Sequence, residues 1–354
     1  MLDNLETIAQ NDPSGMFEAV YNLPEQIQKA YEIGKNINVN VKAEDIDKVV
    51  ITGLGGSAIG GNLLRVFVLD KCKIPVIVNR DYVLPAYVDS KTLVIASSYS
   101  GNTEETLSAY QDAKAKGAKI IAITTGGKLK EFAEKDGFDV ITIPSGLQPR
   151  AALGYSFIPL LMLFVKLGLI EPVDDQIEET VKVLSDLRER YKPEVPEEKN
   201  LAKRLTLKLW NKLPIIYGIS GTTEVIAERW KGQICENSKS PAYFNVFSEL
   251  NHNEIVGTES PKHILGLFEI VMLHDTEDHK RNAIRMDITK DLVKGVVSGV
   301  NDIYSIGNSR LARMFSLIYL GDYVSLYLAT LYQNDPTPVK KIDILKNKLA
   351  EIKD

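Results

Sequence analysis

Two short loops rich in glycine and hydroxyl side chains carry the clearest chemical signal in this sequence. The first loop, residues 53–61 (GLGGSAIGG), follows a β-branched run at 48–52 and leads into an apolar segment. We therefore expect it to lie where a strand meets a helix. Glycines at such a junction let the backbone approach an anion, and they expose N–H groups at the positive end of the helix dipole. Gly56 and Ser57 are the residues expected to contact a phosphate.

The second loop, residues 97–106 (SSYSGNTEET), also follows a strand-like run and opens a helix. Ser98, Ser100 and Thr103 put three hydroxyls on one tight turn. In a parallel sheet, these hydroxyls and Ser57 would face one crevice at the carboxyl ends of neighbouring strands. Neutral hydroxyls together with N–H groups at helix starts suit a phosphate monoester. The simpler alternative is that Ser100 or Asn102 only caps the helix that follows.

A dinucleotide site is the rival interpretation of the first loop. Gly53, Gly55 and Ala58 satisfy the G-x-G-x-x-G/A pattern, and Arg80 and Asp81 stand at the end of the next predicted strand. This interpretation predicts an NAD(P)-dependent dehydrogenase. It gives the hydroxyl-rich second loop no purpose, so the two loops together favour phosphate binding.

The elements that must position these loops alternate between strands and helices. Strand-like runs in the first half lie at residues 48–52, 75–79, 92–96, 119–123 and 139–143. An amphipathic helix is predicted between the third and fourth of them, at 104–116. This alternation indicates an α/β fold with a parallel sheet that is covered on both faces.

The second half of the chain repeats the pattern. A strand-like run at 214–217 precedes residues 218–222 (GISGT), which match residues 53–57 in position and type after a shift of 165 residues. Further strands are predicted at 242–246, 264–273 and 301–306. The chain is therefore interpreted as an internal duplication of one α/β unit. We expect an N-terminal helical segment at 1–47, a first domain at 48–165, a helical connection and linker at 166–200, and a second domain at 201–354.

Composition limits the partners and the location. The chain has 354 residues and a formal charge of −5, which argues against a nucleic-acid binder, because such a protein needs a basic face for phosphates. Cys72 and Cys235 lie far apart without metal-ligand spacing, which is typical of a protein in the reducing cytoplasm. The most apolar stretches, 155–165 and 315–332, are interpreted as core helices and not membrane spans, because the first is too short and the second carries Asp322.

Five separated motifs give the chain a resemblance to a known family. They are G-G-S at 55–57, S-x-S-G-N-T-E-E-T at 98–106, P-R at 149–150, C-E-N-S at 235–238 and E-L-N-H-N-E at 249–254. With these motifs in this order, the chain resembles the bifunctional phosphoglucose/phosphomannose isomerases, which are built from SIS (sugar isomerase) domains. The resemblance implies two αβα sandwich domains with parallel, flavodoxin-like sheets. It also implies an aldose–ketose isomerase, without metal or other cofactor, that interconverts glucose 6-phosphate and mannose 6-phosphate with fructose 6-phosphate.

The resemblance further implies roles for four side chains. Glu236 corresponds to the base that moves a proton between C1 and C2 through a cis-enediol, and Arg150 to the cation that stabilises the charge of that intermediate. His252 corresponds to the acid/base that opens the sugar ring, which an imidazole can do near neutral pH. Lys346 is the best match for a lysine that assists ring opening. Three more lysines crowd the same predicted helix: Lys340, Lys341 and Lys348.

Structural alternatives exist for these residues. An isolated glutamate such as Glu236 is most often a surface charge, and a lone histidine is more often structural than catalytic. His274 and His279 stand in a charged segment at 274–280 (HDTEDHK) that is interpreted as a solvated loop. Only His252 lies inside a dense polar motif.

The family's histidine reaches the site from the neighbouring subunit, so the resemblance implies a homodimer with His252 acting across the interface. The apolar helix at 310–331 is a candidate interface element, or simply core. A non-catalytic regulator that binds sugar phosphates on the same fold is the main alternative, but it would have no use for Glu236 or His252. A metal-dependent isomerase is disfavoured because no His/Glu cluster has ligand spacing.

Overall fold

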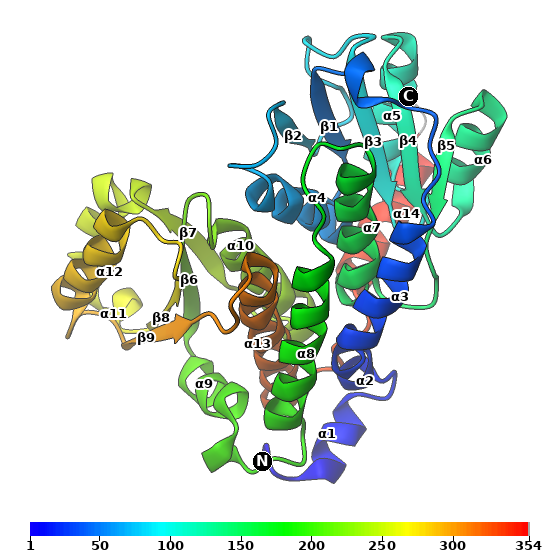
Figure 1. Cartoon of the computed structure of the whole chain (residues 1–354). Helices are drawn as coiled ribbons and strands as arrows, with labels where there is room; N and C mark the ends of the chain where they lie inside the picture. Colours follow the sequence, from blue (N-terminus) through cyan, green and yellow to red (C-terminus); the bar gives the residue numbers. More distant parts are fainter. Residues whose placement is uncertain (353–354) are drawn as a thin grey trace.

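β-Branched runs between glycine-rich and polar turns form the strands of the first half. The computed structural model describes residues 1–352, and Figure 1 shows how its elements are arranged. Five parallel strands form the first sheet in the order β2-β1-β3-β4-β5, which is the flavodoxin-like order. They are β1 (Lys48–Thr52), β2 (Val76–Asn79), β3 (Thr92–Ser98), β4 (Lys119–Thr124) and β5 (Asp139–Thr142). All five runs expected from the sequence are strands.

The second sheet repeats the first with one strand fewer. Its strands are β6 (Leu213–Ile219), β7 (Tyr243–Phe247), β8 (Phe268–His274) and β9 (Gly299–Tyr304). They are parallel in the order β7-β6-β8-β9, which matches the first four strands of the first sheet. The α/β fold of two related units is therefore confirmed. The domain boundaries stay a prediction, and residues 353–354 of the expected second domain lie outside the described part of the chain.

Helices cover both faces of the first sheet because the side chains of a strand alternate between its faces. Val49 and Ile51 of β1 pack into the large core cluster, which also contains side chains of α4 and α7. Val50 packs into a separate cluster on the other face, with side chains of α5 and α6. These helices are α4 (Gly55–Phe67), α5 (Glu104–Ala115), α6 (Gly127–Asp136) and α7 (Leu153–Lys166).

The N-terminal segment is helical only as far as Lys35. It forms α1 (Leu5–Asn11), α2 (Met16–Tyr21) and α3 (Leu23–Lys35), and α3 packs against α7. Later helices are α8 (Asp174–Tyr191), α9 (Leu201–Leu209), α10 (Glu224–Gln233), α11 (Lys262–Leu265), α12 (Lys280–Val293), α13 (Arg310–Leu331) and α14 (Lys340–Glu351). Short 3₁₀ turns are η1 (Ala43–Asp45), η2 (Pro149–Ala151), η3 (Glu197–Lys199), η5 (Glu249–His252) and η6 (Glu254–Thr258), and η4 (Ile234–Ser238) is a π-helical turn.

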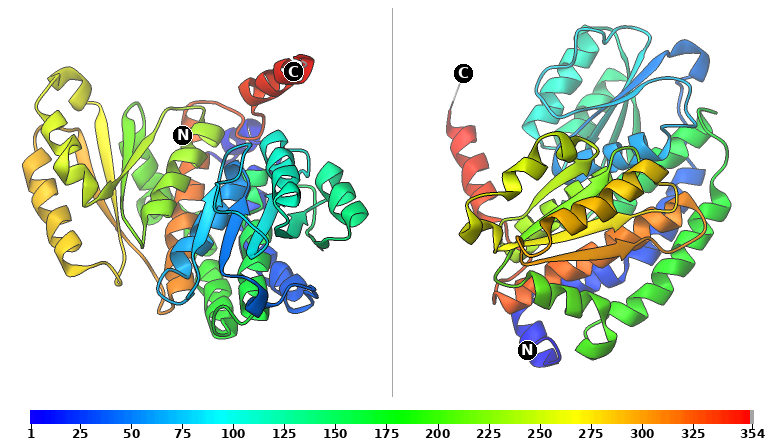
Figure 2. Two further views of the ribbon diagram at one scale, coloured as in Figure 1. Left: turned by 90° about the horizontal axis from the view of Figure 1, so that it is seen from above. Right: turned by 90° about the vertical axis from the view of Figure 1, so that its left-hand side faces the viewer.

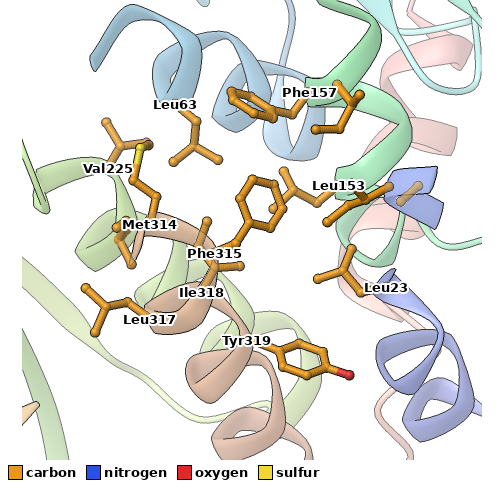
Figure 3. Close-up of a cluster of buried hydrophobic side chains, with 14 of the residues drawn as sticks. Leu23, Leu63, Leu153, Phe157, Val225, Met314, Phe315, Leu317, Ile318 and Tyr319 are labelled. Atoms are coloured by element: carbon orange, nitrogen blue, oxygen red, sulfur yellow. The ribbon is translucent and has the colours of Figure 1, made fainter. Parts of the chain in front are cut away.

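The long helix α13 joins the two halves into one core. It packs against α8, α9 and α10. Phe315 of α13 lies against Phe157 of α7, with 5.6 Å between the ring centroids, and Figure 3 shows side chains of both halves meeting there. Among residues 1–352, only α13 is long and apolar enough to cross a bilayer, but its most apolar stretch is completely buried inside the protein. It is a core helix, and Asp322 lies buried within it.

Two sequence-based expectations in the second half are wrong. The apolar stretch that begins at 264 does not start a strand there, because α11 ends at Leu265 and β8 begins only at Phe268. His274 does not lie in a solvated loop. It is the last residue of β8 and is buried, its Nε2 lies 2.9 Å from the Asp302 Oδ1, and its ring stacks on Tyr304. A sheet partner, invisible in the local sequence, therefore fixes this histidine.

The last helix, α14, stands apart from the rest of the molecule in both views of Figure 2. None of its residues is buried. Ile342, Leu345 and Leu349 recur every three or four positions and are each at least 40% exposed. An apolar stripe of this kind normally covers another surface.

Candidate active site

The first hydroxyl-rich loop lies at the start of α4. Gly55, the first residue of this helix, has a φ of +52°, a conformation that L side chains rarely adopt. Ser57 is buried two residues later, and its Oγ accepts a hydrogen bond of 3.3 Å from the Tyr99 backbone N–H. The first turn of α4 therefore contacts the second loop directly, as parallel neighbouring strands require.

The second loop folds its hydroxyls around one turn after β3. Ser98 Oγ lies 2.9 Å from Thr103 Oγ1 and accepts a hydrogen bond from Gly101 N. Ser100 is exposed, and its Oγ accepts from Asn102 N at 3.3 Å. Because α5 starts at Glu104 without a side-chain capping bond, Ser100 does not cap that helix. Four hydroxyl groups thus gather at the carboxyl ends of β1 and β3.

Gly56 brings the arginine loop close to this hydroxyl cluster. A Cβ at Gly56 would lie 2.7 Å from the Pro149 carbonyl oxygen and 3.0 Å from its carbon. Only glycine therefore lets the start of α4 lie against η2, which contains Arg150. The effect of Gly56 on the backbone was not visible in the sequence, where it was expected only to contact phosphate.

Arg150 is buried between the two halves of the chain. Its Nε donates to Asn237 Oδ1 at 2.6 Å, and its Nη2 donates to the carbonyl oxygens of Pro336 and Thr337 at 2.5 and 2.8 Å. Its Nη1 lies 3.5 Å from Glu236 Oε2. Burial lowers the pKa of the Arg150 guanidinium, and the nearby Glu236 carboxylate opposes that shift. The sequence-predicted base and cation are therefore in contact, although they are 86 residues apart.

Glu236 faces a cavity of about 610 Å³. It lies in the π-helical turn η4, directly after α10, and a third of its side chain is exposed. Single π turns occur often at functional sites. Here the turn directs Glu236 outward while Asn237 and Ser238 are buried against α13. The other residues lining the cavity are Cys235, Lys239, Ser240, Pro241, Asn334, Asp335 and residues 338–342.

Lys239 is a cavity residue that the sequence analysis missed. Its φ is +58°, in the left-handed region. This turns its Nζ back to donate to the carbonyl oxygens of Glu236 and Pro336, at 2.5 and 3.0 Å. Partial burial of the ammonium group and the charge of Arg150 both lower the pKa of Lys239. Its place directly after the C-E-N-S motif was the only signal in the sequence.

His252 is not brought to this cavity by its own chain. It ends η5, beyond β7, and its side chain is exposed. The neighbouring Asn251 donates to Thr289 of α12, and Glu254 accepts from Tyr217. These bonds fix the His252 segment beside α12, whereas Glu236 lies on the side of α10 and α13.

Lys346 also lies outside the cavity. It is exposed on α14, one and a half turns beyond the first residues of that helix, Lys340 and Lys341, which do line the cavity. Thr337 contributes its carbonyl to Arg150, while its Oγ1 is buried and has no hydrogen-bond partner in the described part of the chain. Within residues 1–352, no group of three or more His, Cys, Asp or Glu side chains could hold a metal ion.

In the second unit, the loop at 218–222 corresponds to the first hydroxyl-rich loop, and its hydroxyls donate hydrogen bonds to carboxylates. Thr222 Oγ1 donates to Asp278 Oδ1 at 2.5 Å, and Ser220 Oγ donates to Glu224 Oε2 at 3.0 Å. Burial raises the pKa of Asp278, and the hydrogen bond from Thr222 opposes this shift. Acidic groups at these hydroxyls would repel a phosphate. The duplicated loop thus keeps its position in the fold without the chemistry of the first.

Comparisons with known proteins agree with these observations. The family described as "SIS domain" matches residues 42–164, and the one described as "Bacterial phospho-glucose isomerase C-terminal SIS domain" matches residues 198–349. A bifunctional phosphoglucose/phosphomannose isomerase of Caldicellulosiruptor bescii is 99% identical over 339 residues, which cover 96% of this chain and 100% of that protein. A protein of the same name from Aquifex aeolicus is 38% identical, over 92% of this chain and 99% of its own length.

Solved structures show the same fold at low sequence identity. A glucose-6-phosphate isomerase like protein from Thermus thermophilus superposes with a TM-score of 0.61 at 18% identity, over 95% of this chain and 96% of its own. At this identity the likeness concerns the fold alone.

Proposed function

The chain belongs to the bifunctional phosphoglucose/phosphomannose isomerase family, and we propose that it interconverts glucose 6-phosphate and mannose 6-phosphate with fructose 6-phosphate. One observation carries the chemical part of this proposal. Arg150 Nη1 lies 3.5 Å from Oε2 of Glu236, and Glu236 lines an open cavity. The close approach of Gly56 to Pro149 ties Arg150 to the hydroxyl cluster. A carboxylate, a fixed cation and a phosphate site on one substrate are what an enediol mechanism needs.

The substrate's phosphate would bind Ser57, Ser98, Ser100 and Thr103, together with N–H groups at the start of α4. This fixes the far end of the sugar. The Glu236 carboxylate then removes a proton from C2 of the open-chain aldose and returns it to C1, and the reverse reaction starts at C1. The Arg150 guanidinium stabilises the negative charge on the enediolate oxygens, which exists only during the reaction and so lowers the barrier.

Ring opening would use His252 of a second copy, with Lys346 assisting. Two features support a homodimer. His252 is exposed and lies away from Glu236 of its own chain. The stripe of Ile342, Leu345 and Leu349 on α14 is exposed. A second copy that covers α14 would exclude water from the cavity, which strengthens every electrostatic interaction in it.

Two inactive variants can test this arrangement. If His252 acts across the interface, a mixed dimer of Glu236→Gln and His252→Ala chains contains one intact site and one doubly altered site. Random mixing at equal amounts should then restore about a quarter of wild-type activity. Both parent variants alone stay inactive. No recovery after confirmed subunit exchange contradicts the shared site.

We also propose a cytoplasmic location. Cys72 and Cys235 are both free thiols, which persist in a reducing compartment.

The main experiment is incubation of the purified protein with fructose 6-phosphate in D₂O, without added metal or nucleotide. Formation of glucose and mannose 6-phosphates carrying deuterium at C2 is expected, because the proton on the carboxylate exchanges with solvent. Glu236→Gln should lower kcat by about 10³-fold or more while sugar-phosphate binding persists. Glu131→Gln, an exposed carboxylate on α6, is the matched control and should keep full activity. Binding without turnover in the wild type would instead indicate a regulator.

A further inference from the structure

Two of the three nitrogens of the Arg150 guanidinium donate hydrogen bonds to uncharged oxygen atoms. Nε donates to the Asn237 amide oxygen at 2.6 Å, and Nη2 donates to two backbone carbonyls, of Pro336 and Thr337. Among residues 1–352, the one carboxylate in contact with it is Glu236, at the longer distance of 3.5 Å. The three short bonds fix the plane of the guanidinium without adding a negative charge.

The Asn237 amide is locked in one orientation by a chain of hydrogen bonds from α13. Ser325 Oγ donates to the carbonyl of Asp322 at 2.7 Å. Its proton is thereby used, so the oxygen accepts from Asn237 Nδ2 at 2.9 Å. Asn237 must then present its Oδ1 to Arg150. Asn237 and Ser325 are both completely buried, so no water competes for these bonds.

A second arginine, Arg229, lies beside these hydrogen bonds and is held by a carboxylate instead of by neutral oxygens. Arg229 Nη2 donates to both Asp322 carboxylate oxygens, at 2.9 and 2.8 Å, and to the carbonyl of Arg150 at 3.0 Å. Gln233 donates to the same carboxylate. The charge of Arg229 is therefore cancelled locally, and this pair fixes the backbone of Arg150. Of these two buried arginines, Arg229 lies 2.8 Å from its carboxylate partner, whereas Arg150 lies 3.5 Å from Glu236.

We propose that Asn237 is a positioning residue whose neutral amide oxygen orients the Arg150 guanidinium while leaving its charge available for the enediolate. This inference rests on the proposed function and deepens it. In a buried site, a carboxylate in place of the amide would pair with Arg150 at close range and weaken its attraction for a developing anion. Asparagine and aspartate have nearly the same shape, so the neutrality of the amide, and not its size, is the property at issue.

The test compares Asn237→Asp with the wild type for binding of two non-reacting ligands. One is an aldonate phosphate of five carbons, whose planar carboxylate copies the enediolate. The other is a hexitol 6-phosphate, which has the same phosphate but an uncharged chain. The variant should bind the aldonate phosphate about 100-fold more weakly and the hexitol phosphate within about threefold of the wild type. Its kcat should fall by about 100-fold while KM changes within about threefold.

Two further variants separate positioning from folding. Ser325→Ala removes the lock on the amide without adding charge, and should weaken the aldonate phosphate about tenfold while sparing the hexitol phosphate. Ser238→Ala is the control, because Ser238 lies on the same turn and donates to the same helix at 2.7 Å but does not contact Arg150. It should bind both ligands as the wild type does. Urea unfolding of each variant reports its folding.

The inference is overturned if Asn237→Asp binds the aldonate phosphate as the wild type does, or loses both ligands equally. It is supported by a selective loss alone. Failure of the proposed function would look different, since the wild type would then not convert fructose 6-phosphate, or Glu236→Gln would turn over normally.

Discussion

Replacing Gly56 by alanine tests whether close contact between α4 and η2 aligns the two ends of the site. The added Cβ would lie 2.7 Å from the Pro149 carbonyl oxygen, and relief to an ordinary contact of 3.4 Å requires a displacement of about 0.7 Å. The atoms that the added Cβ would meet, the carbonyl oxygen and carbon of Pro149, belong to the backbone, so no side chain can rotate away. Arg150 is the next residue after Pro149, and it must move with it relative to Ser57.

Two opposing energies decide the effect of Gly56→Ala on stability. Overpacking against rigid atoms typically costs about 1–3 kcal/mol, while alanine improves a helix interior by up to about 1 kcal/mol. We expect a net loss of about 1 kcal/mol in the free energy of unfolding. Displacement of Arg150 should lower kcat/KM for fructose 6-phosphate by about 10- to 100-fold.

The assay is coupled isomerase activity, together with urea unfolding of the same preparations. Gly232→Ala is the matched control, because Gly232 also lies in a helix, α10, and an added Cβ there meets no atom within 4 Å. That variant should be as stable as the wild type or more so, with unchanged kcat/KM. A Gly56→Ala protein with wild-type stability and wild-type kcat/KM would refute the argument from close contact.

Three further predictions follow from other contacts. Asp322→Ala should lower the free energy of unfolding by about 3–5 kcal/mol, because it leaves the guanidinium of Arg229 buried and unpaired. Urea unfolding measures this loss. A loss below about 1 kcal/mol would mean that water reaches Arg229. The Arg310 guanidinium lowers the pKa of Asp70 below its usual value, so this carboxylate stabilises the fold above its unfolded pKa and stops doing so as the pH falls through the folded pKa. Asp70→Asn should therefore be less stable than the wild type at pH 7 and lose the difference at low pH, and a constant difference from pH 7 to pH 3 would contradict the ion pair. Dialysis against EDTA should leave isomerase activity intact, and a loss that zinc reverses would show a metal requirement.

The sequence predicted the strands well because their signals are local. Each β-branched run between turn residues became a strand, and the two hydroxyl-rich loops came together because parallel neighbouring strands end at one edge of a sheet. The failure at 264 has a local cause too. An apolar run gives no sign of the turn that divides α11 from β8.

Contacts between distant residues could not be predicted in the same way. The bonds that fix Arg150 reach Asn237, 87 residues away, and the carbonyls of Pro336 and Thr337, more than 180 residues away. One signal was available. A single carboxylate, Asp322, in a long apolar helix must have a buried partner, and the structure supplies Arg229. The structure of one chain does not test the roles predicted for His252 and Lys346, because neither side chain lies in the cavity of its own chain.

The single hydrophobic core that contains both Phe157 of α7 and Phe315 of α13 has a consequence for how substrate enters. Because the two units share one hydrophobic core, they cannot separate by a hinge motion without exposing Phe157 and Phe315 to water. We therefore expect the units to melt together in one cooperative transition, and to stay fixed during turnover. We therefore expect any movement that admits substrate to involve an element outside this core, such as α14, none of whose residues is buried.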